Sequence, residues 1–225
     1  MTALNVLFIG NSYTFGNRLP WMLSALAASA EPPCEVAAEM VAEGGVSLEW
    51  HRENAATLEA IGKDGWDFVV LQDHSMGPIW HANRTLEAAR MLDAEIRKAG
   101  ARTVFFLTWA REHLPEMQRP LTQAYRAFAR ELDALIAPVG LAWHRALVAD
   151  PTLALHQDDE SHATPTGSYL AACVFYATLT GNSPVGLAAT LVSDDRTLVT
   201  LDADRARFLQ TFAWKTVEST SGDPS

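Results

Sequence analysis

The chain has 225 residues, of which 48% are hydrophobic and 20% are charged, and its formal net charge at pH 7 is -10. This composition fits one soluble globular domain with a sizeable core. An acidic chain offers no basic surface to a nucleic acid or an anionic membrane, so we expect neither partner.

The compartment is indicated by the cysteines and the N-terminus. Cys34 and Cys173 are too few for a disulfide framework. The first residues lead directly into an apolar run, without the basic segment and cleavage site of an export signal. The apolar segment 19–30 is broken by Pro20 and is too short to span a bilayer. We therefore expect a cytoplasmic protein.

Short apolar runs alternate with segments of helical spacing along the chain. The runs predict buried parallel strands at 6–9, 36–41, 68–71, 104–108 and 141–143. Apolar residues three or four positions apart predict helices over 19–30, 47–61, 82–99 and 120–136. This alternation predicts an α/β fold, a three-layer α/β/α sandwich with a five-stranded parallel, flavodoxin-like sheet.

The C-terminal third is expected to be mainly helical. After a long loop over 145–163, Thr164-Pro165 has the residues of a helix start, and Gly181 those of a helix end. Gly100 and Gly140 are likewise expected to end helices. A last helix is predicted over 203–218. The predicted domain is therefore 1–218, and the small polar residues 219–225 predict a disordered tail.

Polar residues gather at the carboxyl ends of the predicted strands, where open α/β sheets bind ligands. Ser12 follows the first strand in Gly10-Asn11-Ser12, and Gln72 ends the third. Asp159 and His162 lie in the long loop and form the only Asp-x-x-His of the chain. A serine hydroxyl becomes nucleophilic when a histidine takes its proton and a third group orients that histidine. The three residues therefore predict a nucleophile, a base and its orienting carboxylate.

Acyl transfer also needs N–H donors directed at the oxygen that becomes negative. The backbone N–H of Ser12, the backbone N–H of Gly45 and the side-chain amide of Gln72 are the candidates for this oxyanion hole. Gly45 is chosen because a glycine lets its backbone approach a substrate closely. Gly44 is equally unhindered and is the alternative.

On these residues the chain resembles the SGNH (GDSL-like) hydrolase superfamily. Gly10-Asn11-Ser12 is similar to its first block, Gly45-Val46-Ser47 to its glycine block, and Asp159-Glu160-Ser161-His162 to its last block. The resemblance implies that Ser12 is the nucleophile, His162 the base and Asp159 its orienter, with Ser12 and Gly45 in the oxyanion hole. It also implies acetyl esters of carbohydrates as the first substrate class.

The third block departs from the family pattern. Family members usually have Gly-x-Asn-Asp after the third strand, whereas this chain has Gln72-Asp73-His74-Ser75 without an asparagine. Branches similar to sialate O-acetylesterases use a glutamine in a similar position, so we assign the asparagine's role to Gln72. His74 is the alternative donor.

Three further residues after strand ends are the candidate substrate-binding residues, because aromatic faces and a guanidinium suit oxygen-rich ligands: Trp80, Trp109 and Arg111. Packing in the core explains the two tryptophans about as well. The chain lacks the glycine motifs that hold phosphates, and we expect no cofactor. His156 and Asp158, with Asp159 and His162, offer a set of metal ligands, but a site built on Ser12 needs no metal, so none is expected.

The sequence therefore predicts a serine esterase that hydrolyses a small-molecule O-acyl ester through an acyl-enzyme. A thioesterase or lysophospholipase of the same superfamily is the alternative enzyme. A non-catalytic carbohydrate-binding protein is the alternative from another class, although such a module does not need a Ser/His/Asp set. The sequence does not indicate an oligomeric state.

Overall fold

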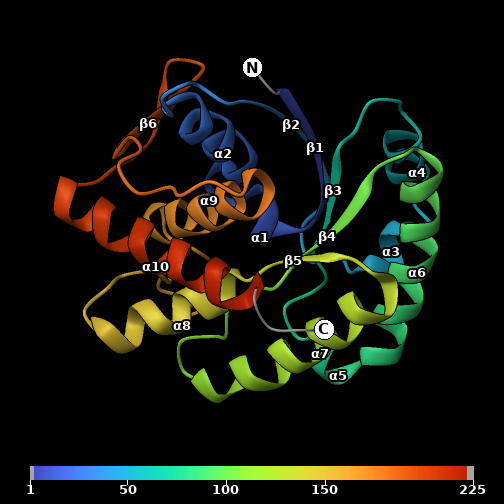
Figure 1. Ribbon diagram of the computed structural model, residues 1–225. Coiled ribbons are helices and arrows are strands. Elements are labelled where there is room, and N and C mark those ends of the chain that lie inside the picture. Colours follow the sequence, from blue (N-terminus) through green and yellow to red (C-terminus); the bar gives the residue numbers. More distant parts are fainter. Residues whose placement is uncertain (1–2, 222–225) are drawn as a thin grey trace.

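Five parallel strands form the centre of the computed structural model, which describes residues 3–221 (Figure 1). Their order across the sheet is β2-β1-β3-β4-β5. This arrangement confirms the predicted α/β/α fold class. The strands are β1 (Ala3–Gly10), β2 (Glu35–Ala42), β3 (Phe68–Leu71), β4 (Arg102–Phe106) and β5 (Leu135–Ala137).

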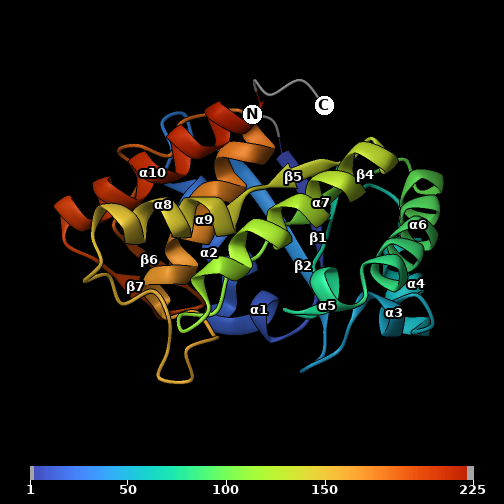
Figure 2. The same cartoon turned by 90° about the horizontal axis from the view of Figure 1, so that it is seen from below.

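Helices cover both faces of this sheet (Figures 1 and 2). One face is covered by α2 (Leu19–Ala28), α8 (Val139–Ala149), α9 (Pro165–Thr180) and α10 (Ala203–Ser221). The other is covered by α3 (Leu48–His51), α4 (Ala55–Ile61), α6 (Ala82–Lys98) and α7 (Gln118–Leu132). Short helical turns complete the set: α1 (Ser12–Phe15), η1 (Gly16–Arg18), α5 (Gly77–Trp80) and η2 (Pro115–Met117).

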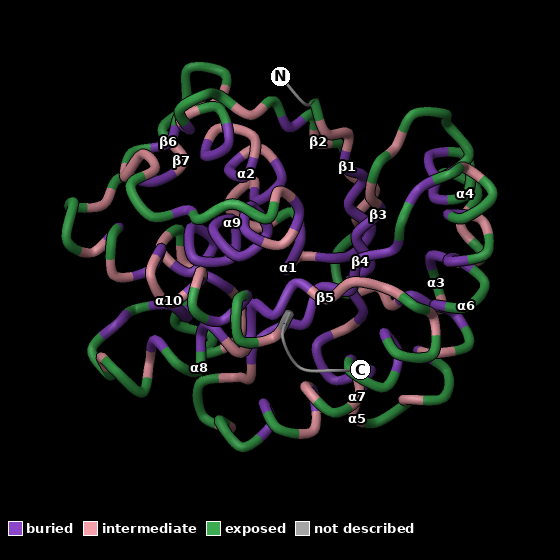
Figure 3. The backbone as a smooth tube through the Cα atoms, viewed as in Figure 1, coloured by how far each residue is buried: buried purple, intermediate pink, exposed green. Residues whose placement is uncertain are grey.

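The strand sequences explain why two cores form. Successive residues of a strand point to opposite faces, so Val6 and Phe8 enter one core while Leu7 and Ile9 enter the other. Because both faces of the central strands are covered, their buried parts are continuous apolar runs, such as Val6 to Ile9 in β1, rather than alternating with polar residues. Figure 3 shows the sheet as a buried centre.

The prediction of the fifth strand at 141–143 is wrong. The strand is β5, and residues 141–143 lie in α8. Helix α7 ends at Leu132 because Asp133 adopts a left-handed conformation, with φ 48°, which frees the next residues to extend. Gly140 does not end a helix either. It lies in the first turn of α8, where an added Cβ would be 2.0 Å from the carbonyl oxygen of Thr108.

Two other differences concern a helix boundary and a hairpin. The helix predicted over 47–61 is two helices, because Asn54 caps α4 by accepting from the N–H of Thr57 at 2.9 Å. The antiparallel pair β6 (Thr190–Ser193) and β7 (Arg196–Thr200) was not predicted. Its turn has Asp194 and Asp195 at φ 48° and 58°, and such turns usually contain glycine or asparagine.

The predicted tail is also corrected in part. Residues 219–221 belong to α10, and residues 222–225 lie outside the described residues. Two hydroxyls in the last turns of α10 have partners: Thr220 donates to the carbonyl of Thr216, and the Ser219 hydroxyl accepts from Arg145 at 2.8 Å. Between residues 3 and 221, no helix is both long enough and apolar enough to cross a membrane.

Candidate active site

Ser12 lies where β1 ends and α1 begins, at the carboxyl edge of the sheet. Asn11 caps α1 by accepting from the N–H of Tyr13 at 3.1 Å. Its amide also donates to the carbonyl of Val46 at 2.9 Å, which ties the loop after β2 to the Ser12 turn. Gly10 is required because an added Cβ would meet Gln72 Oε1 at 2.4 Å.

A buried histidine, His51, also stabilises the turn that bears Ser12. The imidazole of His51 is fully buried and lies 2.8 Å from both the Gly10 carbonyl and the Thr57 hydroxyl. Burial lowers the pKa of His51, so the ring is neutral. Nε2 then donates to the carbonyl of Gly10, and Nδ1 accepts from Thr57. This histidine fixes the end of β1 and takes no part in the chemistry.

His162 and Asp159 are brought to Ser12 by the loop that precedes α9. The Ser12 Oγ and His162 Nε2 atoms are 2.8 Å apart. On the other side of the ring, Nδ1 of His162 is hydrogen-bonded to Oδ2 of Asp159. Thr164 caps α9 as predicted, because its hydroxyl accepts from the backbone N–H of Gly167 at 3.1 Å. The start of α9 therefore fixes the chain just after His162.

Asp159 is held as an anion. The backbone N–H groups of Ser161 and His162 donate to its Oδ1 at 3.0 and 2.9 Å. The hydrogen bond from the His162 side chain is the main cause that lowers the pKa of Asp159 to about 2, and the hydrogen bond from the His162 backbone N–H is the next. An ionised carboxylate only accepts, so Nδ1 of His162 carries the proton and Nε2 presents its lone pair to the Ser12 hydroxyl.

Aromatic rings pack beneath the triad loop. Tyr13 stacks on Trp109 at 4.7 Å between ring centres, and Trp109 stacks on Trp143 at 4.1 Å. The Tyr13 ring also meets the His162 ring edge-on at 5.5 Å. The Tyr13 hydroxyl is 2.6 Å from the Ser161 hydroxyl, and the Trp109 indole donates to the Ser161 carbonyl at 2.8 Å. These contacts therefore position the loop that bears His162.

Trp109 is therefore not a substrate-binding residue, contrary to the prediction. Its side chain is 1% exposed, and its only polar atom is used by Ser161. Trp80 is 65% exposed at the end of α5. Among the described residues, no ring contact or hydrogen bond joins Trp80 to the triad. Arg111 is half-buried and donates to the Ser75 hydroxyl at 3.3 Å.

Gln72 cannot serve as the predicted oxyanion donor in this structure. Its side chain is fully buried, and Oε1 accepts from the Asn11 N–H and the Thr14 hydroxyl, both at 2.8 Å. Because a backbone N–H only donates, this contact fixes which end of the amide is oxygen. Nε2 donates to Asn11 Oδ1 at 3.0 Å and to the carbonyl of Asp73, so both of its hydrogens are used.

Other N–H groups in the loops after β1, β2 and β3 are free to donate. The backbone N–H groups of Ser12 and Gly45 have no acceptor within residues 3–221, whereas that of Gly44 donates to Glu43 at 3.2 Å. His74 is half-buried, and its Nδ1 accepts from Met76 at 3.4 Å. Its proton is thus on Nε2, for which the described part of the chain supplies no acceptor.

Several residues of the site were not identified from the sequence. The hydroxyls of Tyr13 and Ser161 are hydrogen-bonded to each other beside His162, and the Ser75 hydroxyl lies close enough to the Tyr13 phenol to lower its pKa. Burial raises the pKa of Tyr13, so its phenol stays protonated. Tyr13 and Ser161 each adjoin a triad residue in sequence, and that adjacency was the available signal. Over residues 3–221, no group of three or more His, Cys, Asp or Glu side chains is arranged to hold a metal.

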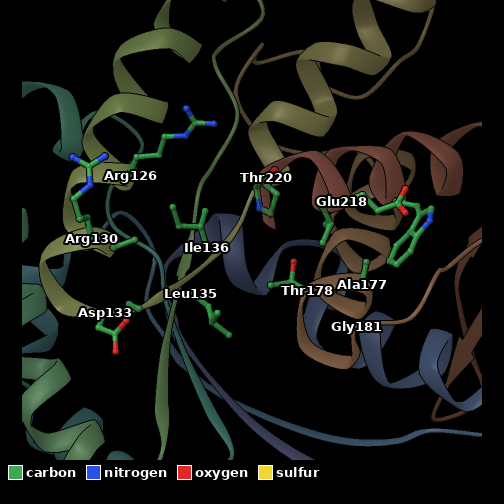
Figure 4. Close-up of a pocket in the computed structure, with 15 residues that line it drawn as sticks. Arg126, Arg130, Asp133, Leu135, Ile136, Ala177, Thr178, Gly181, Glu218 and Thr220 are labelled. Atoms are coloured by element: carbon green, nitrogen blue, oxygen red, sulfur yellow. The ribbon is translucent and has the colours of Figure 1, made fainter. Parts of the chain in front are cut away.

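A large cavity lies away from this site. It has a volume of about 710 Å³ and is lined by residues of α7, β5, α9 and α10, including Arg130, Leu135, Ala177 and Trp214. Figure 4 shows that its labelled side chains come from the start of β5 and the C-terminal turns of the helices around it. Ser12, Asp159 and His162 do not line it. Helix α1, which begins at Ser12, lies at the opposite ends of the strands (Figure 2).

Comparison with known proteins identifies the family. A protein from Slackia heliotrinireducens, provisionally described as an SGNH hydrolase, shares 31% sequence identity and has a TM-score of 0.66, with 79% of this chain and 100% of that chain covered. The chain therefore belongs to the SGNH hydrolase superfamily. No family model matches the sequence, and no curated protein matches it.

Two more distant structures share the fold. A DUF4886 family protein from Bacteroides uniformis has a TM-score of 0.81 at 18% identity, with 97% of this chain and 96% of that chain covered. An acetyl-xylooligosaccharide esterase from Geobacillus has a TM-score of 0.62 at 16% identity, with 78% and 94% covered. At these identities the similarity establishes the common α/β/α architecture.

Proposed function

We propose that this chain is a serine esterase that hydrolyses small O-acyl esters, acetyl esters first, through a covalent acyl-enzyme. The observation that carries the proposal is the continuous hydrogen-bonded set from Ser12 through His162 to Asp159. Membership of the SGNH hydrolases supports it, as does the fold shared with a solved acetyl-xylooligosaccharide esterase.

In the proposed mechanism, His162 carries each proton that is transferred. His162 Nε2 accepts the Ser12 proton as Oγ attacks the ester carbonyl, and the ionised Asp159 stabilises the imidazolium that forms. The imidazolium then gives its proton to the departing alcohol, which leaves the acyl group on Ser12. In the second half, His162 takes a proton from water, the hydroxide attacks the acyl carbonyl, and Ser12 recovers its proton.

We assign the oxyanion hole to the backbone N–H groups of Ser12 and Gly45 and to Nε2 of His74. These three donors lack protein acceptors among residues 3–221, whereas both hydrogens of the Gln72 amide are used. Gly45 has φ 73°, a conformation that glycine adopts without strain. His74 thus takes the place of the asparagine of the third family block.

Ester hydrolysis by wild-type protein and by Ser12→Ala tests the proposal. Ser12 contributes a hydroxyl and little core volume, so the variant should stay folded and lose about three or more orders of magnitude in kcat/KM. Wild-type turnover in the variant would exclude Ser12 as the nucleophile. Rates on acetyl, octanoyl and palmitoyl esters distinguish the acetylesterase from a thioesterase or lysophospholipase, which should prefer the longer chains.

A small-molecule ester as the partner and a cytoplasmic location remain predictions. A binding module without catalysis would show the same fold but no turnover of any ester in this series.

A further inference from the structure

We infer that the ester substrate carries an anionic group, a carboxylate or a group of similar shape and charge, which Arg111 binds beside the catalytic serine. The inference rests on the proposed esterase function and adds the substrate class. Two observations support it: Arg111 has no carboxylate partner among the described residues, and its guanidinium lies close to the triad through Ser75 and Tyr13.

Arg111 lies in the loop after β4, at the carboxyl edge of the sheet where Ser12 lies. Its Nη2 donates to the Ser75 hydroxyl at 3.3 Å, and Ser75 and Arg111 both lie close enough to the phenol of Tyr13 to lower its pKa. Tyr13 follows Ser12 in the chain, and its ring lies 5.5 Å from the ring of His162. Two side chains therefore connect the guanidinium to the catalytic pair.

The charge of Arg111 is unbalanced, unlike that of comparable arginines. Three other arginines are also only partly exposed, and each has a carboxylate within 4.0 Å: Arg18 with Asp194, Arg52 with Glu49, Glu53 and Glu87, and Arg205 with Asp150. Arg111 has none among the residues described. Glu160, another acid of the triad loop, pairs with His113 at 2.7 Å.

One donor of Arg111 is also unsatisfied. Its Nε atom is buried and has no hydrogen-bond partner. A buried N–H without an acceptor costs free energy, and a guanidinium without a counter-ion in a half-buried position costs more. Carboxylates and phosphates present two oxygens at the spacing of the terminal guanidinium nitrogens, so such a group would supply the counter-ion that Arg111 lacks.

The local positive charge is selective because the rest of the chain is acidic. With a net charge of -10, the protein does not attract anions in general. An anionic ester would therefore be bound through Arg111 itself. The anion could belong to the acyl part or to the alcohol part of the ester, and these two sources call for separate substrates.

Two matched ester pairs test the inference. In the acyl pair, the 4-nitrophenyl monoester of adipic acid is compared with its methyl ester, following release of 4-nitrophenol. In the alcohol pair, 4-acetoxybenzoate is compared with its methyl ester, following release of acetate. Within each pair, the ratio of the two kcat/KM values is measured for the wild type, Arg111→Gln, Arg111→Lys and Arg207→Gln. Arg207 is exposed on α10 and controls for the loss of one positive charge.

We expect the anionic-to-neutral ratio in one pair to fall about tenfold or more in Arg111→Gln, mainly through the KM of the anionic ester. Arg111→Lys should retain part of the ratio, and Arg207→Gln all of it. An unchanged ratio in Arg111→Gln for both pairs would overturn the inference. That includes the case in which both esters slow equally, because Arg111 would then act only by positioning Ser75 and Tyr13.

The two proposals fail in different ways. If the wild type hydrolyses neither ester of either pair, the esterase function itself is wrong. If it hydrolyses the esters and the ratio does not depend on Arg111, the esterase function stands and the anionic substrate is rejected.

Discussion

Ser12 and His162 meet at 2.8 Å, but they come from regions built in different ways. Ser12 follows a buried junction of three strand ends, in which Asn11 is 3% exposed and Gln72 is fully buried. His162 and Asp159 come from a surface loop, and their side chains are 39% and 48% exposed. The serine side is thus enclosed in the core, whereas the histidine side is a surface loop held by local hydrogen bonds and by its contacts with Tyr13 and Trp109. Substitutions on the first side should affect stability, and those on the second mainly activity.

The largest effect is expected on the histidine side, from Asp159→Asn. The amide has nearly the shape of the carboxylate but donates toward His162 Nδ1, which favours the wrong tautomer of the ring. We expect kcat to fall by about 10³ to 10⁴ while the melting temperature changes little. The matched control is Asp158→Asn, in the same loop but outside the triad. A Asp159→Asn variant with more than a tenth of wild-type kcat would contradict the role of Asp159.

The loop after β3 should show an effect on kcat alone. If Nε2 of His74 donates to the oxyanion, His74→Ala should lower kcat by about 10² to 10³ with little change in KM or in stability. His81→Ala, at an exposed position between α5 and α6, is the control. Normal kcat in His74→Ala would leave only the two backbone donors in the oxyanion hole.

Gln72→Ala is the contrasting change on the serine side. It removes the acceptor of the Asn11 N–H and the Thr14 hydroxyl and leaves these groups buried. We expect a loss of about 2 to 4 kcal/mol in the free energy of unfolding, seen as a melting temperature about 5 to 10 °C lower, together with reduced kcat. An unchanged melting temperature with a lower kcat would instead indicate that Gln72 donates to the oxyanion.

The smallest effect is on acid stability. The pKa of Asp159 is about 2 in the folded chain, below the ordinary value of an aspartic acid. Its ionised form therefore stabilises the fold above the unfolded pKa, and this contribution is lost as the pH falls through the folded pKa. The difference in melting temperature between the wild type and Asp159→Asn should be small near neutral pH, because the group is exposed, and should shrink between pH 4 and pH 2. A difference that grows on acidification would be the opposite of this expectation.

The same contrast between buried and local interactions explains what the sequence could predict. Apolar runs and helical spacing located four of the five strands, and Thr164-Pro165 located the start of α9. The fifth strand was misplaced because Leu135-Ile136-Ala137 is only three residues long, while Leu141-Ala142-Trp143 is apolar for packing within α8. An apolar run of three residues has no period that separates strand from helix.

Within the site, motif spacing brought together Ser12, Asp159 and His162. It could not reveal that Gln72 faces the interior, because the direction of a side chain at a strand end depends on the register with β1. In this register Gln72 donates its backbone N–H to the Ile9 carbonyl, and its amide points toward Asn11. The role of Trp109 was missed for a similar reason, since stacking between Tyr13 and Trp143 is a tertiary contact.

The central claim is that Ser12 is a nucleophile activated by His162, and a fluorophosphonate probe tests it without knowledge of the substrate. The labelled residue is mapped by mass spectrometry, and the labelling rate is compared between the wild type, His162→Ala and the control His144→Ala, whose residue is exposed on α8. The account predicts one adduct, on Ser12, that forms about 10² or more times slower in His162→Ala and at the wild-type rate in His144→Ala. An adduct on another residue, or equally fast labelling of Ser12 in His162→Ala, would contradict it.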